Sequence, residues 1–286
     1  MKLLSYLKLM RIKHYIKNLL IFVPLIFSMN FYDLNKDIIT LIGFILFSLV
    51  SSIIYIINDI NDIEKDKNHP KKCKRPLASG EVTKKEAYIL LIILALIVII
   101  GNVILRTSWY SIVILVSYLI LNILYSKIFK NIPIVDVICL VVGFVLRVIY
   151  GASLINVQVS NWLYLTIISF AFYLALGKRR NELQVGADTR KVLRFYNKEF
   201  LNKNMYMFLT LMLVFYSMWC VDESNIVKFD NKLIYTVPIL MIIAMKYSFN
   251  IENSAEGDPI EVLLSDKVLI ILVLLFILIM GAIVIM

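Results

Sequence analysis

The chain has 286 residues, of which 60% are hydrophobic and only 17% are charged, and its mean hydropathy is +0.84. An ordinary soluble domain is about 45–50% apolar and about 25% charged, so this composition excludes a cytosolic enzyme, a disordered chain and a disulfide scaffold. The net charge of +10 favours a negatively charged partner, which is anionic lipid, a phosphorylated substrate or nucleic acid.

Nine stretches are apolar and long enough to cross a bilayer as helices, each of which needs about 20 residues. Pro24 interrupts the first of them. The nine stretches cover roughly 18–35, 38–57, 87–105, 108–126, 133–155, 160–177, 205–222, 232–250 and 267–286. The sequence therefore predicts a single all-α, polytopic membrane domain over residues 1–286.

The lysines and arginines between these stretches are unevenly shared between the two sides of the membrane. The side that carries the N-terminus holds 25 of them and the other side holds 4, while Arg147 lies inside a span. Because short cytoplasmic loops collect positive charge, we expect a cytoplasmic N-terminus. The two long loops at 58–86 and 178–204 are then cytoplasmic, and long loops in a compact fold are usually functional. Basic loops beside a membrane also argue against nucleic acid as the partner.

An acidic cluster follows the second span without a break. Asp59, Asp62 and Asp66 are spaced i, i+3 and i+7, so a continuing helix would stack them on one face beside Asn58. Oxygen ligands of this kind suit Mg²⁺. The alternative is a solvated helix end with ordinary surface acids, although ionisable groups directly after an apolar span are costly and usually functional.

A basic cluster and a turn come next. The cations are Lys65, Lys67, Lys71, Lys72, Lys74 and Arg75, and residues 76–80 read PLASG. Attraction to anionic membrane lipids would explain the lysines, at about 1 kcal/mol each. A metal ion together with cations is also the apparatus that holds a diphosphate, and this second hypothesis explains why the acids and bases adjoin.

At these residues the sequence resembles the UbiA superfamily of intramembrane prenyltransferases. The family motif NDxxDxxxD stands here as NDINDIEKD over 58–66, and His69-Pro70 and RPLASG over 75–80 also look like the family. The resemblance covers essentially the whole chain. It implies a UbiA-like bundle of about nine transmembrane helices with a magnesium-dependent site at the cytoplasmic face.

One segment departs from the usual family pattern. Family members carry a second motif, DxxxD, after the sixth span, whereas residues 178–183 read KRRNEL here and Asp188 comes only later. This segment looks like the decaprenyl-phosphate phosphoribosyltransferase branch, as do residues 11–27, 136–152 and the stretch from Gly257 to Asp266. That branch moves 5-phosphoribose from phosphoribosyl diphosphate to a polyprenyl phosphate for cell-envelope precursors, and the resemblance implies a bacterial plasma membrane.

The resemblance and the surplus of cations together suggest roles for individual residues. Asp59, Asp62 and Asp66 are the predicted catalytic magnesium ligands on the donor diphosphate, and Asn58 orients the donor or a ligand. The other predicted substrate-binding residues are Lys17 and Arg75 for donor phosphates, Lys178 and Arg179 for the 5-phosphate or the lipid phosphate, Glu182 for ribose hydroxyls or a metal-bound water, and Arg147. No strong general base is required, because a lipid phosphate is already ionised at pH 7.

Two interpretations remain open for several polar residues. Arg147 is a pocket cation, or it pairs with Asp136 or a backbone carbonyl. Tyr118, Asn122 and Tyr125 share a helix face that lines the pocket or forms a polar seam between helices. His14 and His69 show no metal-ligand spacing.

Three other functions compete with phosphoribosyl transfer. A conventional UbiA prenyltransferase of quinone or haem synthesis would place the diphosphate on the lipid and would be expected to carry the second acidic motif. A lipid transporter would favour internal repeats and charges at the midplane of the membrane. A non-catalytic binder of anionic lipid would explain the lysines but not the stacked aspartates. The sequence predicts no particular oligomeric state.

Overall fold

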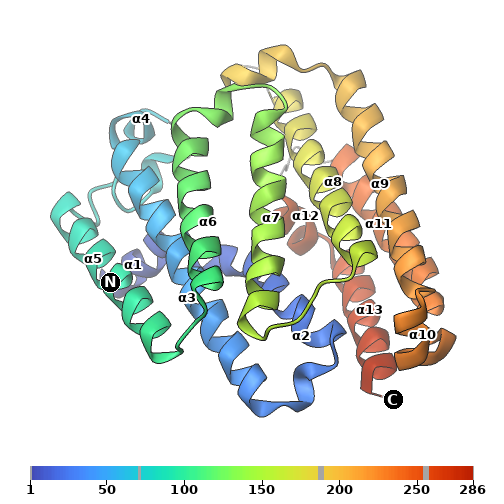
Figure 1. Cartoon of the computed structure of the whole chain (residues 1–286). Helices are drawn as coiled ribbons and strands as arrows, with labels where there is room; N and C mark the ends of the chain where they lie inside the picture. Colours follow the sequence, from blue (N-terminus) through green and yellow to red (C-terminus); the bar gives the residue numbers. More distant parts are fainter. Residues whose placement is uncertain (1, 70–71, 186–189, 254–257, 286) are drawn as a thin grey trace. The chain divides into compact units, whose positions relative to one another are not determined.

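The computed structural model describes residues 2–69, 72–185, 190–253 and 258–285 (Figure 1). All regular elements within these ranges are helical, as the composition predicts, and none is a strand. Four residues of the motifs above, Pro70, Lys71, Asp188 and Gly257, lie outside the described residues. The elements are α1 (Lys2–Met10), η1 (Ile12–Phe22), α2 (Val23–Phe27), η2 (Asn30–Tyr32), α3 (Leu34–Asn61), α4 (Ile63–Lys67), η3 (Lys72–Lys74), α5 (Lys84–Ile104), α6 (Trp109–Lys127), η4 (Phe129–Asn131), α7 (Val135–Leu154), α8 (Asn161–Val185), η6 (Lys191–Phe195), α9 (Lys198–Cys220), α10 (Glu223–Phe229), η7 (Asp230–Thr236), α11 (Val237–Asn253), α12 (Pro259–Ser265) and α13 (Lys267–Ile285).

Six helical segments of the described chain are long and apolar enough to cross a membrane. They are α3, α5, α6, α7, the segment Glu223–Asn253 that ends in α11, and α13. Helices α8 and α9 have 25 and 23 residues, and at about 1.5 Å per residue each also reaches the thickness of the hydrocarbon core. The chain is a multi-pass membrane protein. The count of nine spans and the cytoplasmic N-terminus remain predictions.

The single helix predicted over 18–35 is wrong in its bounds. The chain turns at Arg11 and at Met29, both with positive φ, and the segment between them is the 3₁₀ helix η1 followed by the short α2. From Met10 to Phe22 the chain instead runs antiparallel to α3. Ser52 Oγ donates to the Met10 carbonyl at 2.8 Å, and further along the segment Asn18 Nδ2 donates to Ser48 Oγ at 2.9 Å. Polar contacts with a helix 30 or more residues away cannot be seen in local hydropathy.

Contacts divide the chain into two compact units. Unit 1 comprises residues 1–127 and 146–158, and unit 2 comprises residues 128–145 and 159–286. The chain passes between the units after residue 127, within α7 and after residue 158. The single domain expected over residues 1–286 remains a prediction, and each unit is described by itself below.

Unit 1 is built on α3, which packs against α1, η1, α5 and α6 (Figure 1). Small residues permit close helix contacts, as is usual between helices in membranes. The closest approach is at Gly151 of α7, where an added Cβ would lie 2.0 Å from the carbonyl oxygen of Ile21. Because that oxygen belongs to a backbone, no side-chain adjustment could relieve the clash.

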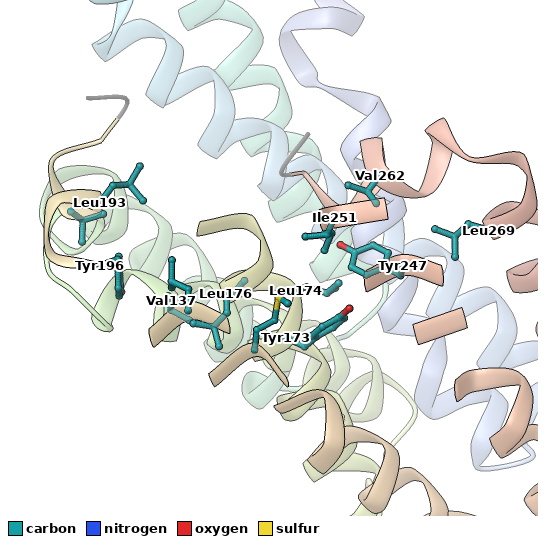
Figure 2. Close-up of a cluster of buried hydrophobic side chains, with 14 residues drawn as sticks. Val137, Tyr173, Leu174, Leu176, Leu193, Tyr196, Tyr247, Ile251, Val262 and Leu269 are labelled. Carbon is teal, nitrogen blue, oxygen red and sulfur yellow. The ribbon is translucent and has the colours of Figure 1, made fainter. Parts of the chain in front are cut away.

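Unit 2 is held by one large apolar cluster. Helices α8 and α9 pack along their lengths, and α11 contacts α8, α9 and α13. Figure 2 shows the cluster, to which side chains from α7, α8, η6, α11, α12 and α13 contribute. Its labelled members are Val137, Tyr173, Leu174, Leu176, Leu193, Tyr196, Tyr247, Ile251, Val262 and Leu269. The short α12 is thus anchored in the core through its buried Val262.

Candidate functional site

Two carboxylates and two guanidinium groups meet at the end of α3. Arg75 Nη1 lies 2.6 Å from Asp66 Oδ2 and 3.2 Å from Asp59 Oδ1, and Arg11 Nη2 lies 2.5 Å from the same Asp59 oxygen. Both aspartates are buried, whereas the two arginines are partly exposed. We call these four residues the acidic site of unit 1. The negative charge of the site is therefore buried, and the two guanidinium groups that pair with it are partly exposed.

The backbone explains why two of the three predicted aspartates come together. Helix α3 ends at Asn61, and Asp62 leaves the helical conformation before α4 begins at Ile63. The break is short, and the amides of Asp62 and Asp66 still donate to the carbonyls of Asn58 and Asp62. Asp59 and Asp66 therefore converge on Arg75, but the stacking predicted for all three aspartates is wrong for Asp62.

The middle aspartate is separate from this pair. The Asp62 side chain is partly exposed and lies 3.5 Å from the exposed Lys65, at the break between the helices. Among the described residues, no group of three or more His, Cys, Asp or Glu side chains gathers closely enough to hold a metal ion. The donor set nevertheless fits Mg²⁺, because Asp59 and Asp66 converge on one cationic nitrogen and offer only oxygen.

Two other residues of unit 1 were predicted to bind the donor, one next to Asp59 and one on η1. Asn58 is half-buried one residue before Asp59, and Lys17 is half-buried on η1. Arg11 was missed as a site residue. Arg11 is one of five basic residues within residues 1–17, so the charge pattern did not single it out, and its partner Asp59 lies 48 residues away.

Arg147 forms a second polar centre in unit 1. Its Nε donates to Asn18 Oδ1 at 2.7 Å, its Nη2 donates to the Tyr118 hydroxyl at 2.7 Å, and its guanidinium lies over the ring of Phe47. The alternative pairing of Arg147 with Asp136 is wrong, because Asp136 pairs within unit 2. Of the shared face predicted for Tyr118, Asn122 and Tyr125, at least Tyr118 belongs to this centre.

The two histidines of the chain have ordinary neighbours. The His14 ring packs against Tyr55 at 5.6 Å between centroids, and His69 Nδ1 accepts from the Lys72 amide at 3.3 Å.

Three consecutive cations at the end of α8 reach three different neighbours in unit 2. Successive residues of a helix point about 100° apart, so they cannot share a partner. Lys178 Nζ lies 3.4 Å from Asp258 at the start of α12, and Arg180 Nε donates to Asn202 of α9 at 2.6 Å. Arg179 lies between them and turns toward the start of α7.

Arg179 is the most enclosed of the three. Its side chain is 0% exposed, and it donates to Asp136 Oδ2 at 2.5 Å and to Glu182 Oε2 at 2.6 Å. The Tyr196 hydroxyl donates to the other oxygen of Asp136 at 2.6 Å. Burial, and then this hydrogen bond, raise the pKa of Tyr196. Arg179 and Glu182 thus form an internal network, and their predicted contacts with phosphate and ribose remain predictions.

Comparison with known proteins identifies a family model and two named proteins that are similar to this chain. Residues 21–225 match the model of the UbiA prenyltransferase family. A decaprenyl-phosphate phosphoribosyltransferase from Mycolicibacterium smegmatis is 29% identical, over 96% of this chain and 91% of that protein. A protein of the same name from Corynebacterium glutamicum is 30% identical, over 94% of this chain and 83% of its own. These matches confirm the resemblance drawn from the motifs.

Solved structures share the fold at lower identity. A UbiA homologue from Archaeoglobus fulgidus, bound to GPP and Mg²⁺, superimposes with a TM-score of 0.68 at 19% identity, covering 99% of this chain and 100% of that one. A UbiA homologue from Aeropyrum pernix gives a TM-score of 0.58 at 16% identity. At this distance the likeness concerns the fold alone.

Proposed function

The chain belongs to the UbiA prenyltransferase family and is a transferase, and we propose that it moves a 5-phosphoribosyl group from phosphoribosyl diphosphate to a polyprenyl phosphate. The observation that carries this proposal is similarity over nearly the whole chain to two proteins named for that activity. The segment over 178–183, which has three cations where the usual family motif has acids, supports the same substrate.

The proposed reaction exchanges one phosphate ester for another at a sugar carbon. The bond between the anomeric carbon and the diphosphate oxygen breaks, and diphosphate leaves with the electron pair. An oxygen of the lipid phosphate forms the new bond to that carbon, which is cation-like in the transition state. The attacking oxygen is already ionised at neutral pH, so the site must stabilise the leaving diphosphate rather than remove a proton.

The acidic site of unit 1 is suited to that task. Asp59 and Asp66 would hold Mg²⁺, with Asp62 contributing as the third predicted ligand, and the ion would supply positive charge to the leaving diphosphate. Arg75 contacts both carboxylates and has a partly exposed side chain, so it can both fix these acids and donate to a phosphate oxygen. Asn58 and Lys17 are the accompanying candidates for orienting the donor.

Unit 2 supplies three of the four remaining candidates. Lys178 has an exposed fraction of 27%, whereas Arg179 is fully enclosed, so Lys178 is the better-placed of the two for a phosphate group. Glu182 accepts from Arg179 and lies 3.4 Å from Arg190, and it is the candidate for ribose hydroxyls. Arg147 is buried in unit 1, and we keep it as a candidate for an anionic group of a substrate.

The proposed setting is the plasma membrane of a bacterium, with the active site facing the cytoplasm. The excess of lysine and arginine in the loops on one side supports this orientation. A water-soluble sugar diphosphate would reach the site from that side, while the lipid acceptor would stay in the bilayer. The product would serve as a sugar donor for the cell envelope.

A second candidate function is prenyl transfer from a polyprenyl diphosphate to an aromatic acceptor. The solved UbiA homologue that shares the fold is bound to GPP, which favours it. Both functions need a site for diphosphate, and they differ in the molecule that carries the diphosphate and in the acceptor.

The test uses purified protein in detergent with Mg²⁺ and phosphoribosyl diphosphate labelled in the ribose. Polyprenyl phosphate is added to one reaction, and polyprenyl diphosphate with an aromatic acid to another. We expect label in the lipid fraction of the first reaction alone, and its loss when EDTA is added. A prenylated aromatic product without labelled lipid would overturn the proposal in favour of the second candidate.

A further inference from the structure

The three cations at the end of α8 differ in how firmly their partners hold them. Arg179 and Arg180 are almost fully buried, and they donate at 2.5 to 2.6 Å to the buried Asp136 and the half-buried Asn202. Lys178 lies 3.4 Å from a single carboxylate oxygen of Asp258 and is partly exposed. A pair of this kind contributes little to stability, so it can exchange partners, whereas the buried pairs cannot.

The two carboxylate oxygens of Asp258 contact different groups. Its Oδ1 accepts from the Ile260 amide at 3.0 Å and caps α12, while its Oδ2 faces Lys178. The other end of α12 has a similar connection, since Asp266 lies 2.8 Å from Lys246 of α11. The helix is therefore held by one lysine at each end and by Val262 in the core.

We propose that Asp258 is a specificity-determining counter-ion that covers the Lys178 ammonium until a phosphate-bearing ligand replaces it. This inference rests on the proposed function for the identity of the ligand. A phosphate or diphosphate carries more charge and more acceptor oxygens than one carboxylate, so it competes successfully for the ammonium. A singly charged anion does not, and Asp258 thereby excludes it.

The structure permits a clean test of this role. An asparagine at this position still offers Oδ1 to the Ile260 amide, and asparagine caps helices as well as aspartate does. The variant Asp258→Asn therefore keeps the acceptor that caps α12 and removes the charge that competes for Lys178. We expect it to bind phosphate-bearing ligands roughly two- to fivefold more tightly, which is the range that a partly exposed ion pair covers.

The matched control is Asp266→Asn. It makes the same change of charge on the same helix and also keeps a cap, since Asp266 Oδ1 accepts from the Leu269 amide, but its partner is Lys246 rather than Lys178. Calorimetry on the full chain in detergent, with Mg²⁺, measures the Kd of inorganic diphosphate, of phosphoribosyl diphosphate and of polyprenyl phosphate. The variant Lys178→Met, alone and combined with Asp258→Asn, completes the cycle.

The expected result is tighter binding in Asp258→Asn, no change in Asp266→Asn, and no effect of Asp258→Asn once Lys178 is methionine. Tightening for the two water-soluble anions assigns Lys178 to the sugar donor, and tightening for the lipid phosphate alone assigns it to the acceptor. Weaker or unchanged binding of all three ligands overturns the inference, because loss of a merely structural contact cannot tighten binding. Tightening for inorganic diphosphate in a protein that forms no phosphoribosyl lipid would support this inference and refute the proposed function.

Discussion

Replacing Asp136 by asparagine should cost more stability than any surface change on the same unit. Asp136 and Arg179 are both fully buried and 2.5 Å apart, so the variant Asp136→Asn leaves a guanidinium in the interior with one carboxylate partner fewer. Loss of one partner of a buried pair costs about 3–5 kcal/mol, and we expect about 3 because Glu182 still contacts Arg179. At about 2–4 °C per kcal/mol, the apparent Tm should fall by about 6–12 °C.

The assay is thermal unfolding of the purified protein in detergent, followed by the loss of soluble, monodisperse material. The control is Glu199→Gln on α9, because Glu199 pairs with Lys203 in an exposed pair whose loss should move the apparent Tm by no more than about 1 °C. A double variant, Asp136→Leu with Arg179→Met, should recover most of the loss, since apolar residues of similar volume replace buried ion pairs well. If Asp136→Asn unfolds within about 2 °C of the control, the reasoning about this buried pair is refuted.

Three further outcomes follow from single residues. Gly151→Ala should sharply lower the yield of folded protein on a size-exclusion column, whereas Gly281→Ala should not, because nothing lies within 4 Å of the Cβ that alanine would add there. Asp62→Ala should nearly abolish turnover at an unchanged apparent Tm, because its side chain is partly exposed; retained activity would remove it from the predicted magnesium ligands. The hydrogen bond from Lys246 lowers the pKa of Asp266 to about 2. The contribution of the ionised Asp266 to the free energy of unfolding is therefore complete above the ordinary pKa of about 4 and is lost as the pH falls toward 2. Unfolding curves of wild type and Asp266→Asn should accordingly differ by a constant amount above pH 5 and converge in acid.

Much of the fold could be predicted from the sequence because lipid imposes a simple rule on helices. The apolar runs predicted at 87–105, 108–126 and 267–286 coincide with α5, α6 and α13 to within a few residues. The N-terminal segment could not be predicted in this way. Its course depends on hydrogen bonds to α3 and on the positive φ at Arg11, neither of which leaves a periodic pattern.

The same difference between local patterns and long-range contacts applies to the candidate site. The spacing of the three aspartates is local, and Asp59 and Asp66 still converge across a short break in the helix, whereas Asp62 lies at that break and is separate. The partner of Arg179 is not local, since Asp136 lies 43 residues earlier in the chain. Three consecutive cations at 178–180 indicate a functional or structural site, but the sequence alone could not predict which of the three side chains are buried.

The two buried arginines of α8 also fix the register of that helix. Apolar packing tolerates small slides, because one methyl group substitutes for another with little loss. Arg179 donates to Asp136 of α7 and Arg180 donates to Asn202 of α9, so the two acceptors lie in different directions. Inserting or deleting one residue upstream would turn both side chains by about 100° and separate each from its acceptor. The length of α8 is therefore set by charge, and variation in length should be confined to the loops at its ends.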